Sequence, residues 1–123
     1  MDMQVYFNPN CSKCRTAQGI LAEHNVDADF VRYLDTPPSR ADLERLMRLL
    51  AIDDPRQMMR TGEAAYNDSG LGDPALTKDE LLDAIVKHPI LLERPIVVRG
   101  DRAVIARPPE RVLELLDDHN EHD

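Results

Sequence analysis

Hydrophobic positions near the amino terminus predict a strand, a helix and a second strand. Met3–Phe7 has the character of a short buried strand, and the turn residues Asn8–Asn10 end it. A helix should begin at Cys11 or Ser12, because four positions at helical spacing form one face: Ala17, Ile20, Leu21 and His24. Asn25 can end this helix, and residues 29–34 then alternate in a way that predicts the second strand.

The middle of the chain has helical periods. Ser39 is a good N-cap for a helix that carries Leu43, Leu46, Met47 and Leu50. Pro55 can occupy the first turn of a short helix that ends near Arg60. Residues 61–74 show no clean period and predict a loop, with room for one helical turn. Residues 77–80 form a capping box ahead of a helix with Leu81, Leu82, Ile85 and Val86 on its apolar face.

The carboxyl-terminal part predicts a hairpin and a last helix. Pro95–Arg99 and Arg102–Ala106 are rich in β-branched residues, and Gly100-Asp101 between them suits a type II′ turn. Pro108 and Pro109 should open the last helix. The order is therefore β-α-β, a helical middle, then β-β-α. We expect an α/β protein with a thioredoxin-like fold, in which helices are inserted and the sheet is small and mixed.

Length and composition predict one domain, over residues 1–117, followed by an acidic tail, 118–123, that we expect to fray. The net charge is −8 and no basic stripe is visible, so we expect no nucleic-acid partner. No apolar run approaches the length of a membrane span, and the first residues do not have the pattern of a secretory signal. We therefore expect a cytoplasmic monomer with no membrane partner.

The two cysteines, Cys11 and Cys14, have C-x-x-C spacing. In a cytosolic chain this spacing favours redox chemistry or metal binding over a structural disulfide. Metal binding is the weaker interpretation, because a structural zinc site needs four ligands and the four histidines form no second ligand pair.

Cys11 should lie at the N-terminus of the first helix, where unpaired N–H groups and the helix dipole favour an anion. Arg15, one turn further, adds a positive charge, so we expect a lowered pKa for Cys11. The same N–H groups can hold an oxyanion against the sulfur. Cys14 follows three residues later on the same helix face, in the geometry of a resolving thiol; the alternative for either cysteine is a buried small hydrophobic residue.

Four segments resemble the glutaredoxin-linked arsenate reductase family in order and spacing: YFNPNCSKCR, YLDTPPSRADL, HPILLERPIVV and ARPPE. The resemblance runs from about Met3 to Leu116. It implies a thioredoxin-like domain whose cysteine, here Cys11, attacks arsenate while three arginines hold the oxyanion. These map onto Arg60, Arg94 and Arg107, and guanidinium groups suit a tetrahedral dianion because they pair bidentately with its oxygens.

The family resemblance also implies how the enzyme is recycled. Glutathione attacks the thiol-arsenate adduct, glutaredoxin then removes the glutathione, and arsenite leaves. We therefore expect glutathione as a co-substrate, glutaredoxin as a partner, and no bound cofactor or metal. The resemblance also implies a cis peptide bond at Arg94-Pro95, at modest cost for an X-Pro bond.

Two positions depart from the best-studied members, which have a histidine where this chain has Phe7 and a serine where it has Cys14. A Cys11–Cys14 disulfide would allow recycling by thioredoxin, or a redox-sensing role. Two alternatives therefore stay open: a thiol reductase with another substrate, and a regulator like the related Spx proteins, which bind RNA polymerase. The three arginines Arg60, Arg94 and Arg107 distinguish a reductase from a regulator, because a regulator has no need for a tetrahedral anion site.

Overall fold

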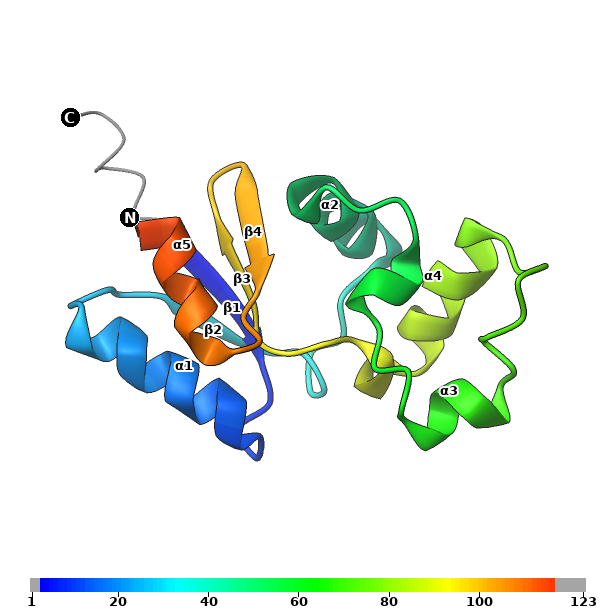
Figure 1. Cartoon of the computed structure of the whole chain (residues 1–123), viewed down its shortest axis with the longest axis horizontal. Coiled ribbons are helices and arrows are strands. Elements are labelled where there is room, and N and C mark those ends of the chain that lie inside the picture. The colour runs from blue at the N-terminus through cyan, green and yellow to red at the C-terminus, as the bar shows by residue number, and fades with distance from the viewer. Residues whose placement is uncertain (1–2, 117–123) are drawn as a thin grey trace. The chain divides into compact units, whose positions relative to one another are not determined.

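The computed structural model describes residues 3–116, in which four strands form one mixed sheet with the order β2-β1-β3-β4 (Figure 1). The strands are β1 (Met3–Phe7), β2 (Asp29–Arg32), β3 (Ile96–Arg99) and β4 (Arg102–Ile105). β1 pairs in parallel with β2 and antiparallel with β3, and β3 pairs antiparallel with β4. The predicted β-α-β and β-β-α order is confirmed.

The chain divides into two compact units. The first contains the residues up to Tyr33 and those from Arg94 onward, and the second is Leu34–Glu93. The prediction of one domain over residues 1–117 stays a prediction, and the predicted tail, 118–123, lies outside the described residues.

In the first unit, helices cover one face of the sheet. α1 (Ser12–Glu23), the 3-10 helix η3 (Pro109–Val112) and α5 (Leu113–Leu116) pack on it (Figure 1). They bury an apolar cluster with the sheet: Met3, Val5, Phe7, Cys14, Ala17, Leu21, Val97, Val104, Ala106, Val112, Leu115 and Leu116. This burial removes apolar surface from water and is the main stabilisation of the unit.

Local signals in this unit have the expected effects, with three corrections. Asn25 ends α1 in a left-handed conformation, φ 58°, and Gly100 has φ 60° with a non-positive φ at Asp101, as a type II′ turn requires. His24 was predicted on the buried face of α1 but is exposed at its C-cap. The second strand ends at Arg32, not at residue 34, because β1 ends opposite it at Phe7. The last helix begins as a 3-10 turn.

The second unit is helical. It contains α2 (Arg40–Leu50), η1 (Pro55–Met58), α3 (Ala64–Asp68), α4 (Lys78–Lys87) and η2 (Pro89–Leu91). Ser39 and Thr77 form the capping boxes of α2 and α4, as predicted. Val86, predicted on the apolar face of α4, is 40% exposed. Arg40 joins the two helices through ion pairs with Asp79 and Asp83 of α4.

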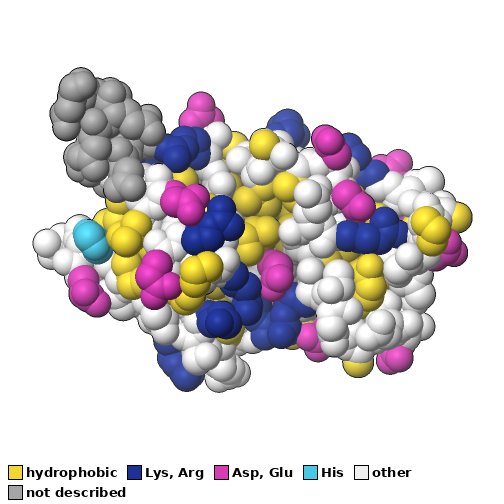
Figure 2. Space-filling model, in the orientation of Figure 1, with side chains coloured by type: hydrophobic (Ala, Val, Ile, Leu, Met, Phe, Trp, Pro, Cys, Tyr) yellow, Lys and Arg dark blue, Asp and Glu magenta, His cyan; other side chains and the backbone are white. Residues whose placement is uncertain are grey.

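The surface carries both signs of charge. On the face drawn in Figure 2, acidic and basic side chains are interspersed, with hydrophobic side chains between them. No single acidic area is visible among the described side chains on this face. Within residues 3–116, no helix is both long and apolar enough to cross a membrane.

Candidate active site around Cys11

Cys11 is the N-cap of α1 and is partly exposed at the end of the turn that follows β1. Its N–H donates to the carbonyl of Asn8 at 3.0 Å, which closes the turn. The turn is also held from inside, since the Asn8 side-chain oxygen accepts from the Asn10 N–H at 2.9 Å. Asn8 is itself buried, so its side chain fixes the loop that presents Cys11.

The surroundings of Cys11 favour its thiolate. Burial would raise the pKa of Cys11, but hydrogen-bond donors outweigh it and lower the pKa to about 7. The largest of these are the Cys14 N–H and the Arg94 guanidinium, followed by the Cys14 thiol and the Lys13 N–H. The Cys11 side chain does not accept a capping hydrogen bond from the N–H groups of Lys13 and Cys14. These groups therefore stabilise the thiolate mainly as oriented dipoles. The predicted direction of the shift is confirmed.

Arg94 and Arg107 bring two guanidinium groups to this sulfur. Arg94 lies two residues before β3, is buried, and its guanidinium contributes to the lowered pKa of Cys11. Nη2 of Arg107 lies 3.9 Å from the Cys11 Sγ, across 96 residues of sequence. Nε of Arg107 donates to the Arg94 carbonyl at 2.7 Å, so the backbone of one arginine positions the side chain of the other. The Arg94-Pro95 peptide is cis, as expected, and Arg107-Pro108 is cis as well.

Tyr33 is a site residue that the sequence analysis missed. It follows β2, is completely buried, and its hydroxyl oxygen accepts from Nη1 of Arg94 at 3.4 Å. Burial would lower the pKa of Arg94, but Tyr33 and Cys11 outweigh it and raise that pKa. The available signal was a tyrosine that continues a half-buried strand, since a buried hydroxyl needs a polar partner. The sequence around Tyr33 does not indicate that Arg94, 61 residues further along the chain, is this partner.

Cys14 lies beneath Cys11 in the first turn of α1. It is completely buried within the apolar cluster, and its sulfur accepts from the Asn8 N–H at 3.5 Å. Burial raises the pKa of Cys14 to about 11, and the neighbouring Cys11 contributes in the same direction. Both cysteines are free thiols. The protonated thiol is therefore favoured at Cys14, whereas the thiolate is favoured at Cys11.

The other two predicted site residues have different surroundings. Arg15 is exposed, and its guanidinium donates to the Pro9 carbonyl at 3.3 Å, on the loop before Cys11. Arg60 belongs to the Leu34–Glu93 unit, where its N–H donates to the Leu91 carbonyl at 2.7 Å and its side chain pairs with Glu63. Their roles at the thiolate and at the anion stay predictions.

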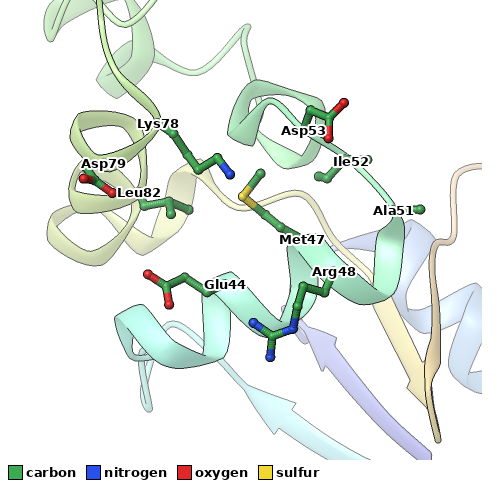
Figure 3. Close-up of a pocket in the computed structure, with 9 residues that line it drawn as sticks. All are labelled: Glu44, Met47, Arg48, Ala51, Ile52, Asp53, Lys78, Asp79 and Leu82. Atoms are coloured by element: carbon green, nitrogen blue, oxygen red, sulfur yellow. The ribbon is translucent and has the colours of Figure 1, made fainter.

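Two other places within residues 3–116 were candidates for a site: a metal cluster and a hollow between α2 and α4. Among residues 3–116, no group of three or more His, Cys, Asp or Glu side chains is placed to hold a metal ion. A hollow between α2 and α4 is drawn in Figure 3. Its lining mixes both charges with apolar side chains and includes no cysteine: Glu44, Met47, Arg48, Ala51, Ile52, Asp53, Lys78, Asp79 and Leu82.

Comparison with known proteins shows relatives along nearly the whole chain. The chain is 41% identical over 115 residues to the arsenate reductase of Neisseria meningitidis, covering 94% of this chain and 98% of that one. It is 42% identical over 116 residues to the arsenate reductase of Haemophilus influenzae, covering 94% and 100%. It is also 41% identical over 114 residues to the uncharacterised protein YfgD of Escherichia coli, covering 93% and 96%.

Solved structures agree with these sequences. The arsenate reductase from Vibrio cholerae matches with a TM-score of 0.90 and 42% identity, covering 93% of this chain and 97% of that one. A protein from Yersinia pestis described as a possible arsenate reductase matches with a TM-score of 0.89 and 45% identity, covering 92% and 99%. The predicted thioredoxin-like fold is confirmed by these neighbours. The model of the ArsC family matches residues 6–115, and the chain belongs to the ArsC family.

Proposed function

We propose that this protein is an arsenate reductase, an oxidoreductase that reduces arsenate to arsenite through the Cys11 thiolate. The observation that carries the proposal is the convergence of Arg94 and Arg107 on the Cys11 sulfur at the N-terminus of α1. The names of the relatives from Neisseria and Haemophilus support it. A thiolate beside two permanent cations suits a substrate that is itself an oxyanion.

The chemistry begins with attack of the Cys11 sulfur on arsenic. A sulfur–arsenic(V) bond forms and one arsenate oxygen leaves as water. A second thiol then attacks, a disulfide forms, and the electron pair of the sulfur–arsenic bond stays on arsenic, which leaves as arsenite. Arsenate and two thiols thus yield arsenite, one disulfide and water. Arg94 and Arg107 stabilise the oxygen charges during the first attack, and we assign Arg60 to the same anion.

The second thiol distinguishes two recycling routes. Glutathione, with glutaredoxin to remove it, is the route that we propose as the main one. Cys14 is the alternative, because it lies in the first turn of the helix that Cys11 caps, and an intramolecular attack needs no encounter with a second molecule. Its burial and its raised pKa disfavour the thiolate that this attack requires. We place the reaction in the cytoplasm, where glutathione is abundant, and propose a monomer.

The assay is arsenate-dependent oxidation of NADPH by the purified protein. It is run with glutathione, glutathione reductase and glutaredoxin, and again with thioredoxin and its reductase. Turnover that Cys11→Ser abolishes is the expected result. Retention of full activity by Cys11→Ser would refute Cys11 as the nucleophile.

Two controls separate the alternatives. Cys14→Ser should retain turnover with glutaredoxin and lose any turnover with thioredoxin. Absence of turnover with both systems, with a reactive Cys11, would favour a thiol reductase with another substrate. A redox-dependent complex with RNA polymerase in a pull-down would favour the regulator.

A further inference from the structure

Arg94 differs from the carboxylate-paired arginines of this chain in the kind of group that orients it. Arg40, Arg60 and Arg111 pair with carboxylates. Within the described residues, the guanidinium of Arg94 has no carboxylate at ion-pair distance. Its side-chain hydrogen bond goes to the Tyr33 hydroxyl, and it also contributes to the lowered pKa of Cys11. It is held by a neutral oxygen on one side and faces the reactive thiol on the other.

The neutral partner has an electrostatic consequence. A carboxylate in the place of the Tyr33 hydroxyl would cancel the charge of Arg94 and would compete with any anion for its donors. A hydroxyl oxygen accepts one N–H and leaves the positive charge uncompensated. Arg94 therefore keeps its full attraction for the Cys11 thiolate and for an incoming oxyanion.

Burial makes this orientation effective. Tyr33 has no exposed surface and Arg94 is 8% exposed, so neither side chain is freely solvated. Nε of Arg94 is buried without a hydrogen-bond partner in the described structure, so the hydrogen bond to Tyr33 is one of few that hold this guanidinium in one rotamer. An arginine free to rotate would spread its charge over several positions, whereas a fixed one is preorganised.

We propose that Tyr33 is a positioning residue of this site: its buried hydroxyl orients the Arg94 guanidinium toward the Cys11 sulfur and toward the oxyanion. The inference deepens the proposed function. Its kinetic readout rests on arsenate reduction, whereas its chemical readout needs no substrate.

The test removes one oxygen atom. Tyr33→Phe keeps the ring that fills the buried position, so the variant should retain the fold, which thermal unfolding monitors. The rate of Cys11 alkylation by iodoacetamide is measured against pH, without arsenate. The midpoint should rise by about half a pH unit, which is about a threefold smaller thiolate fraction well below the midpoint. With arsenate, KM should rise about three- to tenfold.

A double-variant comparison separates positioning from a general structural role. Arg94→Met removes the group through which Tyr33 acts, so Tyr33→Phe added to Arg94→Met should leave the alkylation midpoint where Arg94→Met puts it. An unchanged midpoint for Tyr33→Phe in the wild-type background would overturn the inference. So would an equal shift in both backgrounds, because Tyr33 would then act without Arg94. Neither result depends on turnover, so a protein inactive on arsenate still tests the inference.

Discussion

Replacing Arg94 by methionine should make Cys11 a weaker acid and a slower nucleophile at neutral pH. Methionine keeps an unbranched, flexible stem but is shorter and removes the charge that contributes to the lowered pKa of Cys11. Cys11 has a pKa of about 7, against an ordinary value of 9.0. At pH 7 about half of Cys11 is thiolate, whereas a cysteine with the ordinary value would be about 1% thiolate.

The expected size of the effect follows from how the shift is shared. Oriented N–H groups of Lys13 and Cys14 remain when Arg94 is removed, so only part of the shift is lost. An opposite charge in contact typically contributes about one to three pKa units, and partial exposure of Cys11 puts this case at the lower end. A midpoint near pH 8 leaves about a tenth of Cys11 ionised at pH 7. Alkylation at pH 7 should therefore slow about fivefold.

Alkylation by iodoacetamide, followed by mass spectrometry of the intact protein from pH 5 to pH 10, measures this effect. The variant should be slower than the wild type only below its midpoint. At pH 10 Cys11 is ionised in both proteins, and the more basic Cys11 sulfur of the variant should react at the same rate or about threefold faster. Arg111→Met is the matched control, because Arg111 is in the same unit but pairs with Glu114 at 2.9 Å.

Equal midpoints for Arg94→Met and the wild type would refute the electrostatic account of Cys11. A midpoint that moves as far in Arg111→Met would show that net charge, not the contact with the sulfur, sets the acidity. A variant that is slow at all pH values, including pH 10, would indicate a blocked or displaced sulfur instead of a weaker acid.

Three further predictions follow from the same contacts. The lowered pKa of Cys11 should make the free energy of unfolding rise between about pH 7 and 9, and the raised pKa of Cys14 should make it fall between about pH 9 and 11. In urea unfolding, Cys14→Ala should not show the fall between pH 9 and 11, and an unchanged fall would contradict the raised pKa of Cys14. Glu63→Gln should lower the KM for arsenate about threefold, because it frees Arg60 from its ion pair, and an unchanged or higher KM would place Arg60 outside the anion site. Asn8→Ala should lower the melting temperature by about 4–8 °C, since the turn loses its side-chain acceptor, while Asn8→Asp keeps it; equal melting temperatures for both variants would refute this role.

Local physics accounts for the parts of the fold that the sequence predicted well. The capping boxes at Ser39 and Thr77 use hydrogen bonds within four residues, so the sequence places α2 and α4 without reference to the rest of the chain. Gly100 sets the hairpin turn for the same reason, because it is a residue that readily takes a positive φ. The position of Cys11 at the start of α1 also depends only on the adjacent turn.

Burial was predicted less well, because it depends on what packs against an element. His24 and Val86 continue the apolar periods of their helices, yet both are exposed near helix ends, where no neighbouring element covers them in the described structure. The strand predicted to residue 34 ends at Arg32 because its partner β1 ends first. A strand needs a partner, and a sequence window does not contain one.

The site divides in the same way. The sequence by itself determined that Cys11 would lie at a helix N-terminus, since the turn and the helix are local. Only the tertiary structure decided which side chains meet it: Nη2 of Arg107 comes from 96 residues away, and Tyr33 is joined to Arg94 across 61 residues. Sheet pairing of β1 with β3, and of β3 with β4, brings these segments together. The pKa of Cys11 therefore depends on both levels, because the Cys14 and Lys13 N–H groups that lower it are local to α1, whereas the charge of Arg94 is brought by the folded sheet.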